Sequence, residues 1–384
     1  MSDLTDGVLM KDIQEIREDF PVTKKKIFLN HAGVSPLPKP VSEAMRAHLE
    51  ERSQQDESRF DLDESRKTFA ELIHADPSEI ALVPNTSTGM SIAANMLEYP
   101  SGCNVVTTDL EFPSVVYPWL SRKMRSQVKA RFVRNVEGEI RLEDLEKNVD
   151  DRTVAIAVSH VEYSNGFRND LKAIAETAHR HGALLIVDAC QSAGALSIDV
   201  NREDVDLLTT SCFKWLLGPC GAGFLYVKKD IVEQSQPVFV GWASVKDEVF
   251  ETIELWDNKE LPLSETARRF ETGTPSIAGY VGATAAAKLL LKIGMDEVES
   301  RVTGLAGFLV ERLEDEGFKV QTSGAVERRS GIVNFLVRNP QEKAEKLRQR
   351  SIIVSARMNG LRVSPHFYNT EEELEKLIAE ASSI

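Results

Sequence analysis

Cysteine is scarce in this sequence, and its spacing argues against two classes of protein. The four cysteines form no C-x-x-C pair, so we expect neither a zinc site nor a disulfide framework. No apolar run approaches the roughly 18 residues of a membrane span. The acidic segment 1–20 lacks the apolar core of a signal peptide. These absences predict a protein of the reducing cytoplasm without a membrane partner.

Positive charge is also in short supply. The sequence has 46 Lys and Arg against 60 Asp and Glu, a net charge of −14, which argues against binding to nucleic acid or anionic membranes. The seven histidines form no metal-binding pattern, and we expect no metal. No polar loop continues into the Gly-Lys-Ser/Thr of a nucleotide-binding loop. The glycines at 218, 221 and 223 are in the wrong order for a dinucleotide fingerprint, and they precede a strand instead of a helix.

Strand and helix signals alternate from residue 80 to residue 187. This alternation predicts an α/β fold whose sheet is mainly parallel. A chain of 384 residues is long for one core, so we expect a large and a small domain. The last ninety or so residues have a different, α+β character. We assign residues 21–260 to the large domain, with 261–290 contributing to the site and an interface, and residues 1–20 plus 291–384 to the small domain.

Residues 183–227 contain the two side chains that most clearly indicate a chemical function, each at the end of a predicted strand. This stretch opens on the apolar run 183–187, which ends on Asp188 and is typical of a strand buried on both faces. A second strand-like run, 205–211, leads to Lys214. Ligands of such sheets bind beyond the carboxyl ends of the strands. A carboxylate and an amine at two strand ends indicate a bound cationic ring and a covalently attached carbonyl.

Small hydroxyl residues mark a candidate phosphate site. Asn85-Thr86-Ser87-Thr88-Gly89 follows the predicted strand 80–83 and opens a helix. Backbone N–H groups and hydroxyls at such a helix start favour an anion. Thr274 precedes another Ala-rich helix in the same way. Simple N-capping of the helices is the alternative, and the residues themselves leave it open.

Seven motifs occur together along the chain in the order seen in one enzyme family. They are Asn30-His31-Ala32-Gly33, Asn85-Thr86-Ser87-Thr88-Gly89, Glu111-Phe112-Pro113-Ser114, Asp188-Ala189-Cys190-Gln191, Ser211-Cys212-Phe213-Lys214-Trp215, Glu271-Thr272-Gly273-Thr274-Pro275 and Leu361-Arg362-Val363-Ser364. The chain resembles the class V aminotransferases, which include cysteine desulfurases and, as the branch we expect here, isopenicillin-N-epimerase-like proteins. The resemblance implies pyridoxal 5′-phosphate (PLP), fold type I and a seven-stranded sheet with a smaller C-terminal domain.

The resemblance also implies a role for each site residue. Lys214 would form the internal aldimine and move the Cα proton, and Asp188 would hold the ring nitrogen protonated. Gln191 would reach the phenolic oxygen, and Phe112 would cover the ring. The phosphate would be bound by Thr86, Ser87 and Ser211, and by Thr274 of a partner subunit in a homodimer. Some relatives have a phosphate-binding histidine where this chain has Phe213, so the resemblance does not carry that one phosphate contact over to this chain.

The resemblance points to an α-amino acid as the substrate. Arg362 matches the arginine that clamps its α-carboxylate. Arg357, on a predicted loop, is a second clamp or faces solvent, and His31 faces the substrate or packs in the core. Segment 355–361 contains no cysteine, which argues against persulfide-forming desulfurase chemistry. Transamination, racemisation or epimerisation, and β-elimination from a cysteine-like substrate remain open. A non-catalytic PLP-binding relative is a further alternative.

Overall fold

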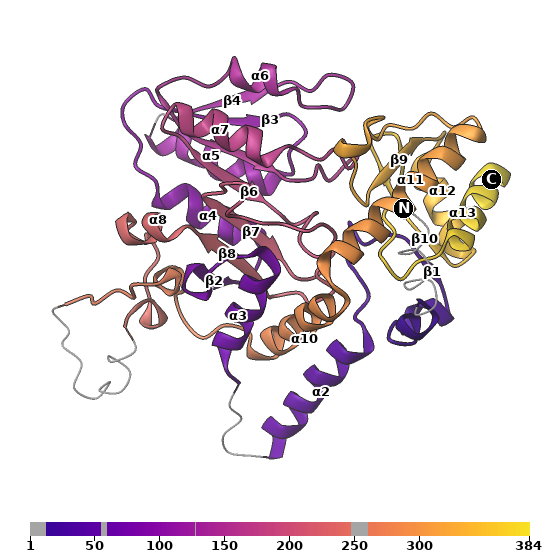
Figure 1. Ribbon diagram of the computed structural model, residues 1–384, viewed down its shortest axis with the longest axis horizontal. Coiled ribbons are helices and arrows are strands. Elements are labelled where there is room, and N and C mark those ends of the chain that lie inside the picture. Colours follow the sequence, from indigo (N-terminus) through magenta and orange to yellow (C-terminus); the bar gives the residue numbers. More distant parts are fainter. Residues whose placement is uncertain (1–12, 55–59, 127, 247–259) are drawn as a thin grey trace.

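The computed structural model describes residues 13–54, 60–126, 128–246 and 260–384, and a seven-stranded sheet lies at its centre (Figure 1). The strand order is β2-β8-β7-β6-β5-β3-β4. The strands are β2 (Ile80–Val83), β3 (Asn104–Thr108), β4 (Lys129–Val133), β5 (Thr153–Ser159), β6 (Leu184–Asp188), β7 (Leu207–Ser211) and β8 (Gly223–Val227). Neighbours from β7 to β4 are parallel, whereas β8 runs antiparallel to both β7 and β2. The predicted α/β fold with a mainly parallel sheet is confirmed.

The reversal at β8 has a local cause. A parallel neighbour needs a crossover of about a dozen residues or more, usually a helix. The segment between Ser211 and Gly223 contains no helix and turns back on itself instead. A Cβ at Gly223 would lie 2.5 Å from the carbonyl oxygen of Thr210, so only glycine fits where β8 begins. The turn that carries Lys214 therefore stays at the edge of the sheet where the parallel strands end.

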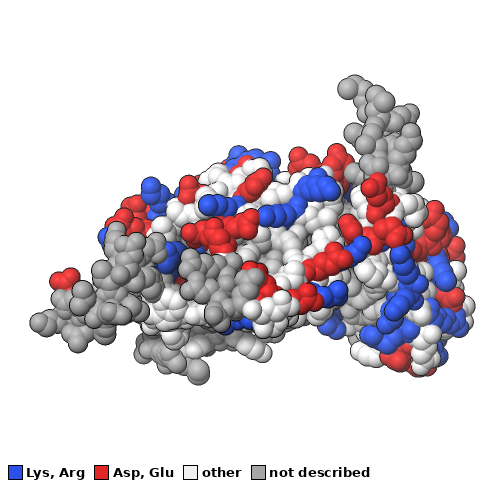
Figure 2. Space-filling model, turned by 90° about the horizontal axis from the view of Figure 1, so that it is seen from below, with Lys and Arg blue, Asp and Glu red and all other residues white. Residues whose placement is uncertain are grey.

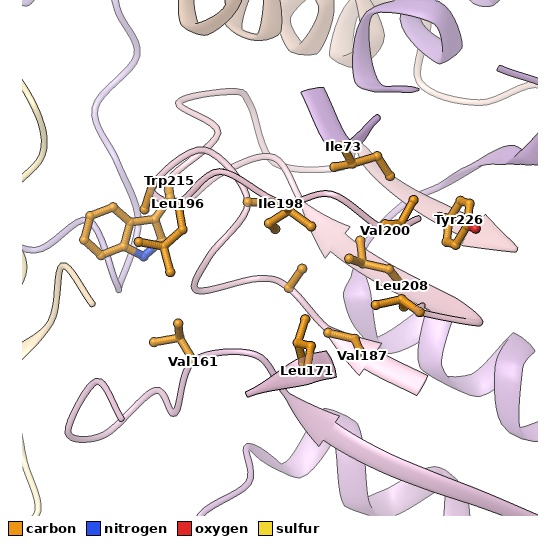
Figure 3. Packing of buried hydrophobic residues seen from close by; sticks show 14 of the residues in the cluster. Ile73, Val161, Leu171, Val187, Leu196, Ile198, Val200, Leu208, Trp215 and Tyr226 are labelled. Carbon is orange, nitrogen blue, oxygen red and sulfur yellow. The ribbon is translucent and has the colours of Figure 1, made fainter. Parts of the chain in front are cut away.

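Both faces of the sheet are covered, and alternate residues of one strand enter different cores. Val187 and Leu208 belong to one hydrophobic cluster, while their neighbours Ile186 and Leu207 belong to a second cluster. Figure 3 shows Val187, Leu208 and Ile198 among the buried side chains of the first cluster. Strands buried on both faces read as continuous apolar runs, which explains the run that ends on Asp188.

Helices from different parts of the chain form the two outer layers. The first cluster takes side chains from α3, α7 and α10, and the second takes them from α4 and α5. The helices of this part are α2 (Lys39–Gln54), α3 (Leu62–Ile73), α4 (Thr86–Met96), α5 (Pro113–Ser126), α6 (Leu142–Glu146), α7 (Leu171–Arg180), α8 (Lys229–Gln234) and α10 (Ile277–Ile293). No single helix in the described ranges has the length and apolarity to cross a membrane. Helix α10 and the next helix, α11 (Met295–Asp315), meet that test only as a pair, across a bend of 83°.

The C-terminal part forms a smaller body, orange to yellow in Figure 1. It contains the antiparallel sheet β11-β12-β9 and a core of its own. Its elements are α11 (Met295–Asp315), β9 (Val333–Leu336), α12 (Pro340–Gln349), β10 (Ile352–Ile353), β11 (Ser355–Arg357), β12 (Gly360–Val363) and α13 (Glu371–Ser383). The loop predicted at 355–361 is thus a β-hairpin.

The N-terminal segment packs on this C-terminal body. Phe20 stacks on Tyr368 with ring centroids 3.8 Å apart, and Arg17 pairs with Glu373 at 2.8 Å. The short strand β1 (Ile27–Phe28) pairs with β10. The contacts of Arg17 and Phe20 agree with placing residues before 21 beside the C-terminal part. Strand β1, which we assigned to the large domain, also pairs with the C-terminal part, and the domain boundaries stay a prediction.

Charges of both signs are distributed over the molecular surface. On the face seen in Figure 2, acidic and basic side chains alternate without a continuous field of either sign. The sequence also predicts a short amphipathic helix at 9–20. Residues 13–18 are helical, and residues 9–12 lie outside the described residues. Trp256, which we expected near an interface, also lies outside them.

Candidate active site

A cavity of about 510 Å³ opens where the parallel strands end. Nine of the eleven predicted site residues line it: Thr86, Ser87, Phe112, Asp188, Gln191, Ser211, Lys214, Arg357 and Arg362. Asp188 is the last residue of β6 and Ser211 the last residue of β7. The sheet topology thus brings together side chains that are far apart in sequence, as expected for the carboxyl edge of an open α/β sheet.

Asp188 and Lys214 face the same cavity with few partners of their own. Asp188 is 5% exposed and accepts one hydrogen bond, from the N–H of Cys190 at 2.8 Å. Burial raises the pKa of Asp188, and the Cys190 N–H and the Lys214 charge oppose that rise. The Nζ of Lys214 lies 5.6 Å from the ring centroid of Phe112. A buried carboxylate with unused lone pairs calls for a cationic N–H partner.

Gln191 is oriented by the two ends of its amide. Its Oε1 accepts a hydrogen bond from the indole N–H of Trp215 at 2.9 Å, and its Nε2 donates to the carbonyl oxygen of Ala32 at 3.1 Å. An amide nitrogen has two N–H groups, so one remains for a group in the cavity. Trp215 is fully buried and fixes which end of the amide faces inward.

The start of α4 forms a hydroxyl cradle with the end of β7. The hydroxyl of Ser211 accepts a hydrogen bond from the Thr86 N–H at 2.8 Å and pairs with the Thr86 hydroxyl at 2.8 Å. Ser87 pairs with Ser114 at 2.7 Å. A Cβ at Gly89 would lie 2.0 Å from Thr209 Oγ1, so glycine lets α4 approach β7 closely. Hydroxyls and a helix N-terminus suit a phosphate group.

Aromatic rings border the cavity on one side. Phe112 is 41% exposed, which leaves one face of its ring available to a flat ligand. Phe112 also contacts Tyr163: the two rings meet edge to face, with 5.2 Å between their centroids. Phe213, in the place where some relatives have a histidine, has its ring centroid 5.8 Å from Lys214 Nζ. This arrangement offers stacking but no hydrogen bond from position 213.

Arg362 reaches the cavity from β12 in the C-terminal body. Its Nη1 donates to the carbonyl oxygen of Tyr163 at 2.7 Å, and its Nε donates to Ser355 Oγ at 3.2 Å. Only 2% of Arg362 is exposed. Burial and then the charge of Arg357 lower the pKa of Arg362 to about 9. Such a guanidinium, still cationic at neutral pH, is suited to a carboxylate ligand.

Two predicted residues do not line this cavity. His31 is completely buried; its Nδ1 bonds the carbonyl oxygen of Ser364 at 2.8 Å and its Nε2 the hydroxyl of Tyr368 at 2.7 Å. Both ring nitrogens are thus used in the core, so the geometry gives His31 no contact with a substrate. Thr274 is exposed and borders two other surface pockets, a position that leaves it available to a partner chain.

Sequence reasoning missed several residues of the cavity wall, among them Asn85, Ser114, Ser159, Tyr163 and Cys190. Ser159 is the last residue of β5 and pairs in register with Asp188, so the rule that found Asp188 could have found it. Three others lie inside motifs quoted above. Tyr163 follows β5 in an irregular segment, and no local pattern marks it.

Comparison with known proteins agrees with this geometry. A model of the family "Aminotransferase class-V" matches residues 27–377. The chain belongs to this family. A Bacillus subtilis (strain 168) relative, the uncharacterized aminotransferase YcbU, is 32% identical and aligns over 96% of this chain and 97% of its own length. A probable cysteine desulfurase of Pyrococcus abyssi is 31% identical over 96% of both chains.

Solved structures of class-V relatives share the whole fold. The apo structure of a cysteine desulfurase from Thermococcus onnurineus NA1 has a TM-score of 0.85 at 27% identity, covering 95% of this chain and 96% of that one. The cystine C-S lyase C-DES, in complex with its product cysteine persulfide, has a TM-score of 0.86 at 25% identity, covering 95% and 99%. The isopenicillin-N-epimerase-like branch stays a prediction.

This class-V protein is a PLP-dependent enzyme, and the residues around its cavity fit that cofactor. The hydroxyl cradle of Thr86 and Ser211 matches a phosphate. The single-partnered carboxylate of Asp188 matches a protonated ring nitrogen, and the amine of Lys214 lies on the same cavity. The cavity therefore has residues suited to the phosphate, to the ring nitrogen and to the carbonyl group of PLP.

Proposed function

We propose that this enzyme binds PLP in the 510 Å³ cavity through Lys214 and acts at the Cα of an α-amino acid whose carboxylate is bound by Arg362. The observation that supports this most directly is the convergence of Lys214, Asp188 and Arg362 on one cavity. A non-catalytic binding protein would have no use for an amine and a carboxylate clamp facing the same space.

Each residue contributes one physical action. PLP supplies an electron sink for a carbanion at Cα when it is bound. Asp188 keeps the ring nitrogen protonated, because a buried carboxylate favours a cationic neighbour. The amine of Lys214 accepts the Cα proton at Nζ and returns it. Arg362 orients the substrate through its carboxylate, so that the bond to be broken faces the ring.

The cofactor's other contacts position it. Gln191 would donate its remaining amide hydrogen to the phenolic oxygen, and Phe112 would cover the ring and exclude water from one side. Thr86, Ser87 and Ser211 hold the phosphate by hydroxyl and backbone donors.

We infer that the working enzyme is a cytoplasmic homodimer. Thr274 is exposed at the end of a strongly apolar surface in which Val238, Phe239 and Trp242 are 58%, 57% and 55% exposed. Apolar patches of this kind usually mark interfaces. In the dimer, Thr274 would donate its hydroxyl to the phosphate bound by the partner chain.

Transamination is the first reaction to test, and C–S bond cleavage in a cysteine-like substrate is the second candidate. The second is supported by the C-S lyase among the structural relatives. Persulfide formation on the hairpin is disfavoured, since Ser355–Arg357 and Gly360–Val363 contain no cysteine. Racemisation begins with the same removal of the Cα proton but returns a proton to the opposite face of Cα, and it is a further outcome of the assay.

The test combines a spectrum with a substrate screen. The purified enzyme should absorb in the visible, and Lys214→Ala should remove that band while the far-UV circular dichroism stays the same. Amino acids are then screened for keto acid, pyruvate, sulfide and loss of optical activity. A Lys214→Ala protein with the parent's visible band, or a parent that exchanges no Cα proton with any amino acid, would rule the proposal out.

A further inference from the structure

Arg357 and Arg362 lie on the same face of one hairpin. In β11 and β12, Ser355 pairs with Arg362 and Arg357 pairs with Gly360. Paired residues of antiparallel strands point to the same face, and so do residues two apart along a strand. The two arginines are therefore diagonal neighbours, with Cα atoms about 7–8 Å apart. Gly360, opposite Arg357, has no side chain, and Asn334 Oδ1 occupies the place that a Cβ would take.

The hairpin tip is held rigidly. Asn334 Nδ2 donates to the carbonyl oxygen of Arg357 at 3.2 Å, and Gln321 Nε2 donates to that of Met358 at 3.1 Å. A Cβ at Gly360 would lie 2.3 Å from Asn334 Oδ1, so the amide packs directly on the hairpin backbone. The backbone of Arg357 is thus fixed while its side chain is exposed at the rim of the cavity.

Neither arginine has an acidic partner within the described segments. Arg357 donates to the carbonyl oxygen of Ala356 at 2.7 Å, and Arg362 donates to Tyr163 and Ser355. A buried guanidinium beside another guanidinium is unfavourable until anions arrive. The phosphate and the ring nitrogen of PLP already have other partners in the assignment above. The α-carboxylate of a substrate balances one of the two positive charges, and the second remains.

We propose that Arg357 binds a second anionic group, and that the substrates are α-amino acids with an acidic side chain. This inference rests on the proposed function, because it takes Arg362 as the clamp for the α-carboxylate. The acid group lies at the cavity rim, where Arg357 is exposed and water is near. Its contribution is therefore sensitive to salt.

The first test compares acidic with neutral amino acids on the holoenzyme. Aspartate, glutamate and 2-aminoadipate carry the acid at increasing distances, and alanine and 2-aminobutyrate carry none. We expect kcat/KM for the best acidic substrate to exceed that for 2-aminobutyrate by about tenfold or more, the effect of one charged hydrogen bond. Arg357→Gln should lower that ratio about five- to tenfold, and Arg357→Lys should restore part of it. Arg338→Gln, an exposed arginine outside the cavity, should leave the ratio as it is.

The second test measures binding without turnover. Succinate and glutarate should bind the holoenzyme more tightly than propionate in calorimetry, and Arg357→Gln should remove the difference. Added NaCl should reduce it as well. If wild type and Arg357→Gln show the same acid-to-neutral ratio and the same preference for dicarboxylates, the inference is overturned.

The two proposals fail in different ways. Arg362→Gln should weaken the binding of alanine as well as that of glutamate, since both carry an α-carboxylate. If alanine depends on Arg362 while acidic side chains give no advantage, only the second-anion site is lost. If no amino acid depends on Arg362, the proposed function itself is wrong.

Discussion

Glu111 gives the sharpest prediction about stability. It lies directly before Phe112, is 9% exposed, and accepts hydrogen bonds from the Ser159 N–H at 2.9 Å and the Ser159 hydroxyl at 2.6 Å. Burial raises the pKa of Glu111 to about 8 from an ordinary value of 4.5; the Asp188 charge adds to the rise, while the Ser159 bonds oppose it. A pKa of about 8 favours the protonated form of Glu111 in the folded enzyme at neutral pH.

This protonation makes the enzyme's stability depend on pH. Between pH 4.5 and about 8 the folded state holds a proton that the unfolded state has released, so the free energy of unfolding falls as pH rises. At about 1.36 kcal/mol per pH unit, the loss across this window amounts to up to about 5 kcal/mol. Glu111→Gln keeps the shape and neutrality of the protonated acid: its carbonyl accepts from the Ser159 N–H and its NH₂ donates to the Ser159 hydroxyl.

The measurement is urea unfolding of wild type and Glu111→Gln from pH 5 to pH 8.5. The two proteins should be similarly stable near pH 5, and the variant should be the more stable by up to several kcal/mol at pH 8. Part of the slope should persist, because burial also raises the pKa of Glu162 well above its usual value. Glu314→Gln on the exposed surface of α11 serves as the control. Identical pH slopes in wild type and Glu111→Gln would refute the reasoning.

Three further predictions concern the cofactor site. Gly89→Ala should cost about 1–3 kcal/mol of stability and weaken PLP binding, because its Cβ would meet Thr209 Oγ1 at 2.0 Å; an unchanged melting temperature and PLP affinity would contradict this. Asp188→Asn should slow exchange of the substrate Cα proton, measured by NMR in D₂O, by about a hundredfold or more, and a parental rate would exclude its role at the ring nitrogen. Mixing Lys214→Ala chains with chains altered at Thr274 should restore partial activity in heterodimers, whereas a mixture that stays inactive after verified subunit exchange would argue against shared sites.

Much of the cofactor side of the cavity could be predicted from local sequence. The run before Asp188 is continuously apolar because this strand is buried on both faces of the sheet. Asp188 is the polar residue that ends the strand at the sheet edge. The same holds for Ser211 at the end of β7. Asn85 caps α4 by accepting from the Thr88 N–H at 2.9 Å, so the N-capping alternative is true together with the cradle. These strand ends and this helix start can be recognised from a few neighbouring residues, without knowledge of the tertiary contacts.

Other features depend on contacts that no local pattern reveals. The partners of His31 lie more than three hundred positions away in sequence, and they turn a motif histidine into a core residue. The sequence predicts a strand at 361–364, which β12 matches, but it predicts a loop before it, where β11 is only three residues long. The turn of this hairpin uses Met358 and Asn359 at φ of 45° and 60°, a two-residue reversal with positive φ. The Asn359-Gly360 pair was the available signal.

The walls of the cavity come from the beginning, middle and end of the chain, which has a consequence for biosynthesis. Gln191 bonds the carbonyl oxygen of Ala32, 159 positions away, and Arg362 bonds that of Tyr163, 199 positions away. A ribosome must therefore release nearly the entire polypeptide before the pocket closes. Shortened products that end ahead of β12 retain Lys214 and the hydroxyl cradle in sequence but lack the arginine that we assign to the substrate carboxylate, and they also lack Phe367 and Tyr368, which pack in the same core as Trp215.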